Sequence, residues 1–395
     1  MKRAVIIEGA RTPFGKLNGT LSALTAAELG GIAIKGALER SNVKPEDIDH
    51  VVMGTVLQGG QGQLPSRQAA RNADIPWNVK TEAINKVCAS GMRSVTLADL
   101  YIRAGEAETV VAGGMESMSN APHALLKSRK GYRMGDAALT DLMIYDGLTC
   151  SFTGVHMGTY GNSTAEELGI SRLAQDEWAL RSHRRALEAI DSGKLGEEIV
   201  SVEIPQRKGE PIVVKNDEGP RRDTSLEKLA ALKPAFDPDG TITAGNAPGV
   251  NDGACALVLM DEEKAHQEGR PILANIIASA SVAVPAKDFP KTPGYVINEI
   301  LQKTGKQVAD IDLFEINEAF AAVSLASMQI AELDPEKVNV NGGAVALGHP
   351  IGASGARIIL TLAYELRRRG GGFGIAAICS GGGQGDAILI EVPKQ

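Results

Sequence analysis

An internal repeat is the feature that most constrains how this chain of 395 residues can fold. Three segments recur in the same order, at offsets of 263, 264 and 268 residues: PEDIDHVVMG (45–54) with VADIDLFEIN (308–317), ASGMRSVTLA (89–98) with ASGARIILTLA (353–363), and VVAGGM (110–115) with ICSGGG (378–383). Chance similarity among small residues would not keep three matches in order at so constant an offset. The sequence therefore predicts two related halves.

Short apolar segments alternate with helical patterns along both halves. The strand candidates are AVII (4–7), HVVMGTV (50–56), TVVAGG (109–114), ALVLM (256–260), LFEI (313–316), GIAAIC (374–379) and AILIEV (387–392). Thr25 with Glu28 forms a capping-box pattern that predicts a helix to Arg40, and a second, surface helix is predicted from Ser171 to Gly193. The alternation predicts an α/β fold.

The stretch between the repeated segments is richer in charge and turns, which indicates an inserted lobe. We therefore predict an N-terminal half from residues 1–118 and 250–271, a loop domain from residues 119–249, and a C-terminal half from residues 272–395. Within the loop domain, KSRKGYR (127–133) is basic. It is typical either of a solvated face or of contact with another subunit or an anionic ligand.

Composition and charge exclude several classes of function. A net charge of -7 and a pI near 5.6 disfavour nucleic acids and membrane surfaces as partners, because the average field of the protein would repel them. Four cysteines without regular close spacing predict neither a disulfide framework nor a metal site, and free thiols suit a reducing compartment. No signal h-region or apolar run of about 18 residues occurs, so we expect a cytoplasmic protein.

Cys88 in NKVCASGM (85–92) is the first candidate for chemistry. The segment reads as the first turn of a helix, where free backbone amides and the positive end of the helix dipole favour a negative charge. We therefore expect a lowered pKa and an oxyanion site beside a thiol nucleophile. A lone cysteine in such a position is more often a small buried hydrophobic residue, so a catalytic role for Cys88 depends on which other residues lie near it.

Further candidates stand at other predicted strand ends and turns. His349 lies in a glycine-rich GHPIG turn that predicts a base or an oxyanion donor. Cys379 ends an apolar strand, and Asn317 follows LFEI at a similar place, where α/β proteins bind ligands. Asn317 can anchor a water or simply cap the next helix. Cys150 and Cys255 lack a glycine setting and are interpreted as structural thiols.

Two glycine patterns do not predict nucleotide binding. GAVALGHP (343–350) has the spacing of a phosphate loop, but His349 and Pro350 replace the Lys and Ser/Thr that hold phosphate and magnesium. In GGGQGD (381–386) the glycines precede a strand instead of a helix, which excludes a dinucleotide fingerprint. A nucleoside triphosphatase and a Rossmann oxidoreductase are therefore rejected.

Taken together, the motifs resemble those of the thiolase family over essentially the whole chain. The matching motifs are RTPFG (11–15), NKVCASGM (85–92), GGMESMS (113–119), YDGLTC (145–150), VHMG (155–158), LKPAF (232–236), TAGNAPGVNDGA (243–254), NEAF (317–320), GGAVALGHPIGASGAR (342–357) and CSGGGQG (379–385). The resemblance implies the thiolase fold, with duplicated α/β halves in αβαβα layers and an inserted loop domain. Within the family the chain is most similar to the short-chain, biosynthetic branch.

The resemblance also implies a role for each candidate. Cys88 is the nucleophile that becomes acylated, His349 activates it, and Cys379 removes or returns a proton at the acetyl methyl. Asn317 positions a water in one oxyanion hole, and the amides of Cys88 and Gly381 form the other. The implied reaction is the ping-pong condensation of two acetyl-CoA to acetoacetyl-CoA and CoA, and its reverse thiolysis.

The family pattern implies a short substrate as well. Met157 in VHMG fills the space of a long acyl tail, with Met134 as a second contributor, although methionine also serves as core filler. The implied substrate and CoA contacts are Met134, Leu148, His156, Met157, Arg221, Leu232, Phe236, Ala244, Pro248, Ala319 and Phe320. Pro248 replaces a serine common in relatives, and Lys228 replaces a smaller polar residue near the adenine, so affinity for CoA can differ while the chemistry does not.

The partners expected from the resemblance are acetyl-CoA, acetoacetyl-CoA and CoA, with no cofactor, metal, nucleic acid or membrane. A homo-oligomer is expected, and a tetramer is favoured over a dimer. Two rivals remain. One is a broad-range degradative 3-ketoacyl-CoA thiolase, which would prefer long chains. The other is an inactive acyl-CoA-binding protein, against which the presence of Cys88, His349 and Cys379 argues.

Overall fold

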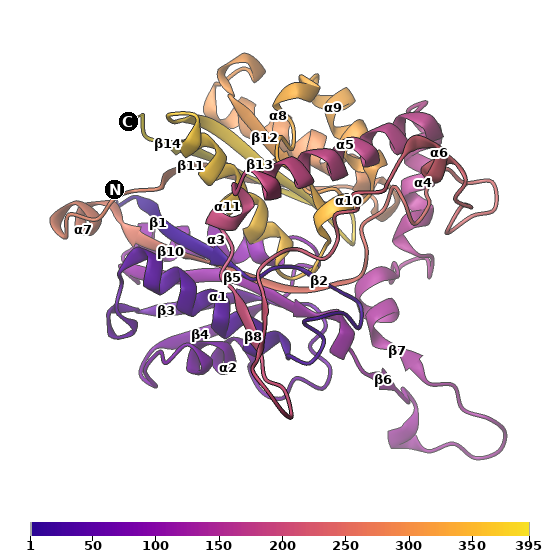
Figure 1. Cartoon of the computed structure of the whole chain (residues 1–395), viewed down its shortest axis with the longest axis horizontal. Helices are drawn as coiled ribbons and strands as arrows, with labels where there is room; N and C mark the ends of the chain where they lie inside the picture. The colour runs from indigo at the N-terminus through magenta and orange to yellow at the C-terminus, as the bar shows by residue number, and fades with distance from the viewer. Residues whose placement is uncertain (1, 395) are drawn as a thin grey trace.

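The computed structural model describes residues 2–394, which form two similar halves joined through one ten-stranded sheet (Figure 1). The strand order is β12-β13-β14-β11-β1-β10-β5-β3-β4, with the short β2 (Gly15–Lys16) beside β10. The other strands of the sheet are β1 (Ala4–Arg11), β3 (His50–Gly54), β4 (Lys80–Ile84), β5 (Thr109–Ser117), β10 (Asn251–Asp261), β11 (Ala274–Ala283), β12 (Leu313–Ile316), β13 (Gly372–Ser380) and β14 (Gln384–Val392).

The strand pairing confirms the duplication predicted from the repeat. In the N-terminal half β3 is parallel to β5, and β5 is antiparallel to β10. In the C-terminal half β12 is parallel to β13, and β13 is antiparallel to β14, so the pattern is the same. The halves meet where β1 pairs with β11, through Val5 with Asn275 and Ile6 with Ala274. All seven predicted strands are present, most of them longer than the apolar run that indicated them.

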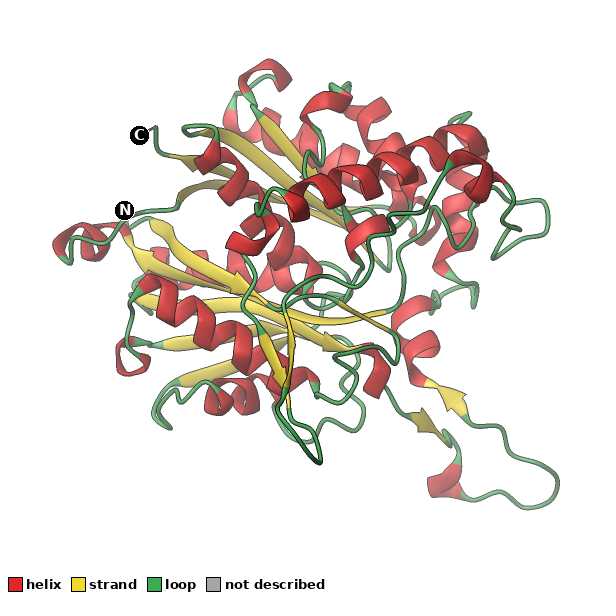
Figure 2. Cartoon of the chain, in the orientation of Figure 1, coloured by secondary structure: helices red, strands yellow, loops and turns green. Residues whose placement is uncertain are grey.

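The helices form three layers around the two parts of the sheet (Figure 2). The central layer holds α3 (Ser90–Ala104) and α11 (Ser354–Arg368), which pack against each other and against strands of both halves. The N-terminal half is covered by α1 (Ala26–Ser41) and α2 (Pro65–Asn72), and the C-terminal half by α8 (Thr292–Thr304) and α9 (Ala321–Ala331). The predicted αβαβα arrangement is therefore confirmed.

Local capping signals act as the sequence predicted. The hydroxyl of Thr25 accepts the amide of Glu28, and the Glu28 carboxylate accepts the amide of Thr25, which completes the capping box of α1. Ser171 caps α5 (Arg172–Asp191) through the amide of Ala174. Within residues 2–394, no helix combines the length and the apolar character needed to cross a membrane.

The stretch 119–249 lies across both halves. Its regular elements are β6 (His123–Ala124), β7 (Thr140–Asp141), a π-helical turn (Met143–Leu148), α4 (Met157–Glu167), α5, β8 (Val202–Ile204), β9 (Ile212–Val214) and α6 (Leu226–Ala230). Trp178 of α5 is buried with the core of the C-terminal half, whereas Val202 and Val214 are buried with that of the N-terminal half. The β6–β7 hairpin projects from the rest of the molecule (Figure 1).

Candidate active site

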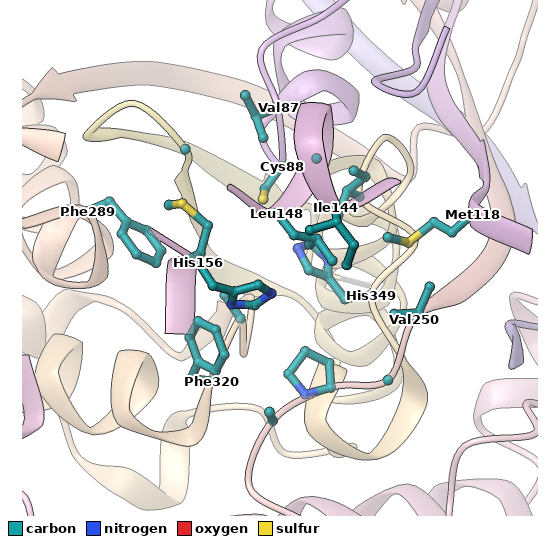
Figure 3. Close-up of a pocket in the computed structure, with 18 of the residues that line it drawn as sticks. Val87, Cys88, Met118, Ile144, Leu148, His156, Val250, Phe289, Phe320 and His349 are labelled. Carbon is teal, nitrogen blue, oxygen red and sulfur yellow. The ribbon is translucent and has the colours of Figure 1, made fainter. Parts of the chain in front are cut away.

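An apolar cavity of about 240 Å³ lies where the two halves and the stretch 119–249 meet. Several elements contribute to its wall, and the side chains of Cys88, His156, Phe320 and His349 face the same space (Figure 3). Of the residues predicted from the sequence, those on the wall are Cys88, Leu148, His156, Met157, Phe236, Pro248, Ala319, Phe320, His349 and Gly381. The cavity therefore collects most of the predicted site from segments far apart in the chain.

Cys88 lies in a tight turn between β4 and the start of α3. Val87, directly before it, has φ of 46°, a conformation that a β-branched residue rarely adopts. Ala89 is the N-cap of α3, so Cys88 lies at the positive end of the helix, as predicted. The turn leaves the Cys88 side chain partly exposed at the cavity wall, where a thioester could reach it.

The acidity of Cys88 differs from the sequence-based prediction. Burial in the apolar wall raises the pKa of the thiol to about 11, and the charge of Glu116 adds to this. Hydrogen bonds to the sulfur from the amides of Gly381 and of Cys88 itself act in the opposite direction but do not prevail. The prediction of a lowered pKa is therefore wrong, because burial in apolar surroundings destabilises the thiolate more than the two amide hydrogen bonds stabilise it.

His349 is held by two neighbours in a defined tautomer. Its amide donates to Asn251 Oδ1 at 2.9 Å, and its ring Nδ1 lies 2.6 Å from Ser354 Oγ. We assign the Ser354 hydroxyl proton to the carbonyl of Pro350, 3.0 Å away, so that Nδ1–H donates to Ser354 Oγ. Nε2 is left with a lone pair and has no partner within the described part of the chain.

The protonation state of His349 suits a base. Burial lowers the pKa of the imidazole to about 3, with a further contribution from the positive charge of Arg357. The ring is therefore neutral near pH 7. Because the pKa of Cys88 is raised and that of His349 is lowered, the resting pair is a thiol and a neutral imidazole. Attack of the Cys88 sulfur on a carbonyl therefore needs a base to take the thiol proton, and Nε2 of His349, on the same cavity wall, has a free lone pair.

Asn317 and Cys379 lie behind the cavity wall. Asn317 follows β12 and is fully buried, and its Nδ2 and Oδ1 have no partner among residues 2–394. Cys379 is also fully buried near the end of β13, and burial together with the charge of Cys88 raises the pKa of its thiol. The structure therefore brings the two thiols, from opposite halves of the chain, close enough to influence one another.

A second cavity of about 210 Å³ adjoins the first and shares Ala247, Gly249 and Val250 with it. Arg221 and Ala244, both predicted CoA contacts, line this second cavity instead of the first, together with Lys16 and His183. The amide of Arg221 donates to His183 Nδ1, so the ring proton of His183 is on Nε2. Burial, Arg221 and Lys16 lower the pKa of His183 to about 4. The cavity thus presents donors and positive charge.

Two predicted contacts lie outside both cavities. Met134 is 99% exposed on the projecting β6–β7 hairpin, so the prediction that it helps to fill the acyl pocket is wrong for a single chain. Leu232 is half-buried against the core of the C-terminal half, with its side chain near Gly245. Lys228 is exposed and pairs with Asp223 at 2.8 Å.

Several residues of the site were not predicted from the sequence. Ser354 and Asn251, which orient His349, belong to quoted motifs but carry no signal of their own. Cys150, interpreted as a structural thiol, is buried beside the cavity wall. Although burial raises the pKa of Cys150, hydrogen bonds from Tyr160, from the hydroxyl and amide of Thr153 and from the amide of Phe152 lower it to about 7. Across the described residues, no cluster of His, Cys, Asp and Glu could hold a metal ion.

Two family models match almost the whole chain. The model of the thiolase N-terminal domain matches residues 4–263, and that of the thiolase C-terminal domain matches residues 270–392. The boundary between them falls in the segment that leads into β11, the first strand of the C-terminal half.

Curated proteins and a solved structure are similar over their full length. A probable acetyl-CoA acetyltransferase of Mycolicibacterium smegmatis is 50% identical over 98% of this chain and 100% of its own. The acetyl-CoA acetyltransferase of Cupriavidus necator is 50% identical over 99% and 100%, and one of Escherichia coli is 49% identical over 99% and 99%. The crystal structure of the Bacillus anthracis acetyl-CoA acetyltransferase superimposes with a TM-score of 0.97 at 42% identity, over 100% of this chain and 99% of that one.

Proposed function

The chain belongs to the thiolase family, and we propose that it is an acetyl-CoA C-acetyltransferase that condenses two acetyl-CoA into acetoacetyl-CoA and CoA and catalyses the reverse thiolysis. One observation carries the proposal. The thiol of Cys88, the Nε2 lone pair of His349 and the amide of Gly381 face one apolar cavity of about 240 Å³.

The first half-reaction acetylates Cys88. The thiol proton passes to Nε2 of His349 as the sulfur attacks the thioester carbonyl, and the amides of Cys88 and Gly381 stabilise the oxyanion. When the C–S bond to CoA breaks, the imidazolium returns the proton to the leaving thiolate. Because the resting His349 is neutral, the imidazole is ready to accept the proton without first losing one.

The second half-reaction forms the carbon–carbon bond. Nε2 of His349 takes the proton of the Cys379 thiol, and the resulting thiolate removes a proton from the methyl group of a second acetyl-CoA. The imidazolium Nε2–H and a water held by Asn317 then donate hydrogen bonds to the enolate oxygen. The unpartnered side-chain atoms of Asn317 support this role, because a buried amide without partners is costly. The enolate carbon attacks acetyl-Cys88, and the His349 imidazolium gives its proton to the departing Cys88 sulfur, which restores both thiols and the neutral imidazole.

We propose that the acyl end of the substrate lies in the apolar cavity and that the phosphate-bearing end of CoA lies at the basic one. The shared wall, Ala247, Gly249 and Val250, supports a continuous path between the two cavities. The positive groups Lys16 and Arg221 support an anionic ligand in a protein whose net charge is -7. Leu148, His156 and Phe236 would contact the pantetheine arm, with His156 stacked on Phe236 at a ring-centroid distance of 4.3 Å.

We also propose a homotetramer that acts in the cytoplasm. Exposed apolar side chains on and beside the β6–β7 hairpin support contact with another copy of the chain, and they are Leu125, Leu126, Tyr132, Met134 and Leu139. Four free thiols support a reducing compartment. Light scattering of the wild type and of a Leu139→Asp variant tests the assembly, and a wild-type monomer would contradict it.

Intact-mass spectrometry after exposure to acetyl-CoA tests the proposed function directly. The wild-type protein should gain one acetyl group, which should disappear on addition of CoA, whereas Cys88→Ala should gain none. Absence of the adduct from the wild type would favour the rival acyl-CoA-binding protein. A wild type that thiolyses long-chain 3-ketoacyl-CoA faster than acetoacetyl-CoA would favour the degradative thiolase.

A further inference from the structure

A charged cluster outside the cavity joins the turn that carries Cys88 to the C-terminal half. Lys86 Nζ lies 2.7 Å from Asp386 Oδ1 on β14, and the hydroxyl of Ser281 on β11 donates to the same oxygen at 2.5 Å. The side chain of Asp386 is 4% exposed and that of Lys86 is 20% exposed. Water screens such a pair much less than it screens surface ion pairs, so the contact fixes its partners.

Ser380 provides a second link at the same place. Its hydroxyl donates to the carbonyl oxygen of Lys86 at 2.6 Å, and the residue is fully buried. Ser380 stands between Cys379 and Gly381, whose amide contacts the Cys88 sulfur. The hydrogen bond therefore connects the strand end that supplies one anion-binding amide to the turn that supplies the other.

The turn itself depends on outside support. The amide of Lys86 donates to Ser90 Oγ at 2.8 Å, and the amide of Ser90 donates to the carbonyl of Val87 at 3.0 Å, so the turn moves as one unit. Val87 holds a positive φ that costs free energy and persists only when its surroundings over-determine it. The contacts of Lys86 with the C-terminal half supply that constraint.

We propose that Ser380 and Lys86 are positioning residues that set the separation between the amides of Cys88 and Gly381 across the two halves. Neither residue lines the cavity, so they act through the turn and the strand end. The inference rests on the proposed function for what the two amides stabilise. The link between the Cys88 turn and the strand end that carries Gly381 is independent of the proposed function, because the hydrogen bonds of Lys86 and Ser380 define it.

The Ser380→Ala variant tests this inference with two measurements. The rate of Cys88 acetylation by acetyl-CoA should fall about 10- to 100-fold with KM within about twofold, because the lost alignment matters to the oxyanion and not to ground-state binding. Alkylation of Cys88 by iodoacetamide at pH 9 should slow by about threefold or more, because a displaced Gly381 amide stabilises the thiolate less. The second measurement needs no acetyl-CoA turnover.

Matched variants separate positioning from a general loss of stability. Ser327→Ala removes an equally buried hydroxyl, which donates to the Val323 carbonyl at 2.6 Å inside α9, and should leave both rates unchanged. Asp386→Asn should shift both rates in the same direction as Ser380→Ala, and Ser380→Thr should restore them. Rates in Ser380→Ala and Asp386→Asn within twofold of the wild type would overturn the inference. A wild type that is alkylated normally but never acetylated would overturn the proposed function alone.

Discussion

The Ser354 hydroxyl oxygen lies 2.6 Å from Nδ1 of His349 and at the same time donates to the carbonyl of Pro350. This pairing fixes the proton of the neutral ring on Nδ1 and directs the Nε2 lone pair away from Ser354, toward the cavity. A hydroxyl thus does here what a carboxylate does in many catalytic triads, but without stabilising the imidazolium by charge.

The neutral state of His349 predicts an acid-sensitive contribution to stability. Its folded-state pKa of about 3 lies below the ordinary 6.5, so its contribution is present above pH 6.5 and is lost as the pH falls toward 3. On acidification from pH 6.5 to 5 the wild type should lose about 1.4 kcal/mol per pH unit relative to His349→Gln. Thermal unfolding of both proteins across this range measures the difference.

Comparing the wild type with His349→Gln cancels the contributions of two buried carboxyl groups, whose effect on stability with pH is opposite to that of His349. Burial raises the pKa of Glu116 to about 7 and that of Glu315 to about 8, so these carboxyls add stability as the pH falls below these values. Both are present in the wild type and the variant. Parallel stability curves for the two proteins would show that His349 is not held neutral.

Removal of the Cys379 thiol should block a different step of the reaction from removal of the Cys88 thiol. The Cys379→Ala variant should still be acetylated on Cys88, as seen by intact mass, but condensation should fall by about 10²- to 10⁴-fold because the methyl proton has no acceptor. Cys255→Ala removes another fully buried thiol, which lies on β10 in the core around α3 and α11 and does not line the cavity, and this variant should retain both steps. Equal loss of acetylation and condensation in Cys379→Ala would contradict the division of roles.

Chain-length preference should depend on Met157. This side chain lines the apolar cavity, so Met157→Ala should raise thiolysis of six- and eight-carbon 3-ketoacyl-CoA relative to the four-carbon substrate by about 10-fold. Met328→Ala serves as the matched control, because Met328 is buried in the core of the C-terminal half and does not line the cavity. If both variants keep the wild-type ratio, Met157 does not limit the acyl chain.

The basic cavity should recognise the nucleotide end of the substrate. Arg221→Gln should raise KM for acetyl-CoA about 5- to 10-fold, and its effect should shrink at high salt, while kcat stays near the wild-type value. The shorter substrate acetyl-pantetheine, which lacks the diphosphate, should not distinguish the variant from the wild type. The neighbouring Arg222 pairs with Asp191 at the surface, so Arg222→Gln is the control and should change neither KM.

Much of the fold was predictable, because its signals are local. Apolar runs gave every predicted strand, and Thr25 and Ser171 marked two helix starts through side chains that cap them. The repeat indicated the duplicated sheet, since equivalent segments adopt equivalent structure. The candidate residues came from turns rich in glycine, and most of them meet at one cavity.

The remainder depends on contacts between distant segments, which no local pattern encodes. The pKa of Cys88 was predicted from the helix start alone, whereas the structure adds the apolar wall that raises it. Arg221 was expected with the other CoA contacts but lies in a separate cavity formed with Lys16 and His183. Met134 was placed by resemblance, and only the backbone path of the hairpin shows that it points away from its own pocket.

The narrow junction of β1 with β11 has a consequence for how this protein would respond to damage. Each half has an outer core, and both halves contribute to a shared core around α3 and α11, while the nucleophile Cys88 and the proton carrier Cys379 come from different halves. A slight rotation of one half relative to the other would misalign Cys88 and Cys379 before the outer core of either half unfolded. The catalytic rate is therefore a more sensitive measure of the relative orientation of the two halves than thermal unfolding is.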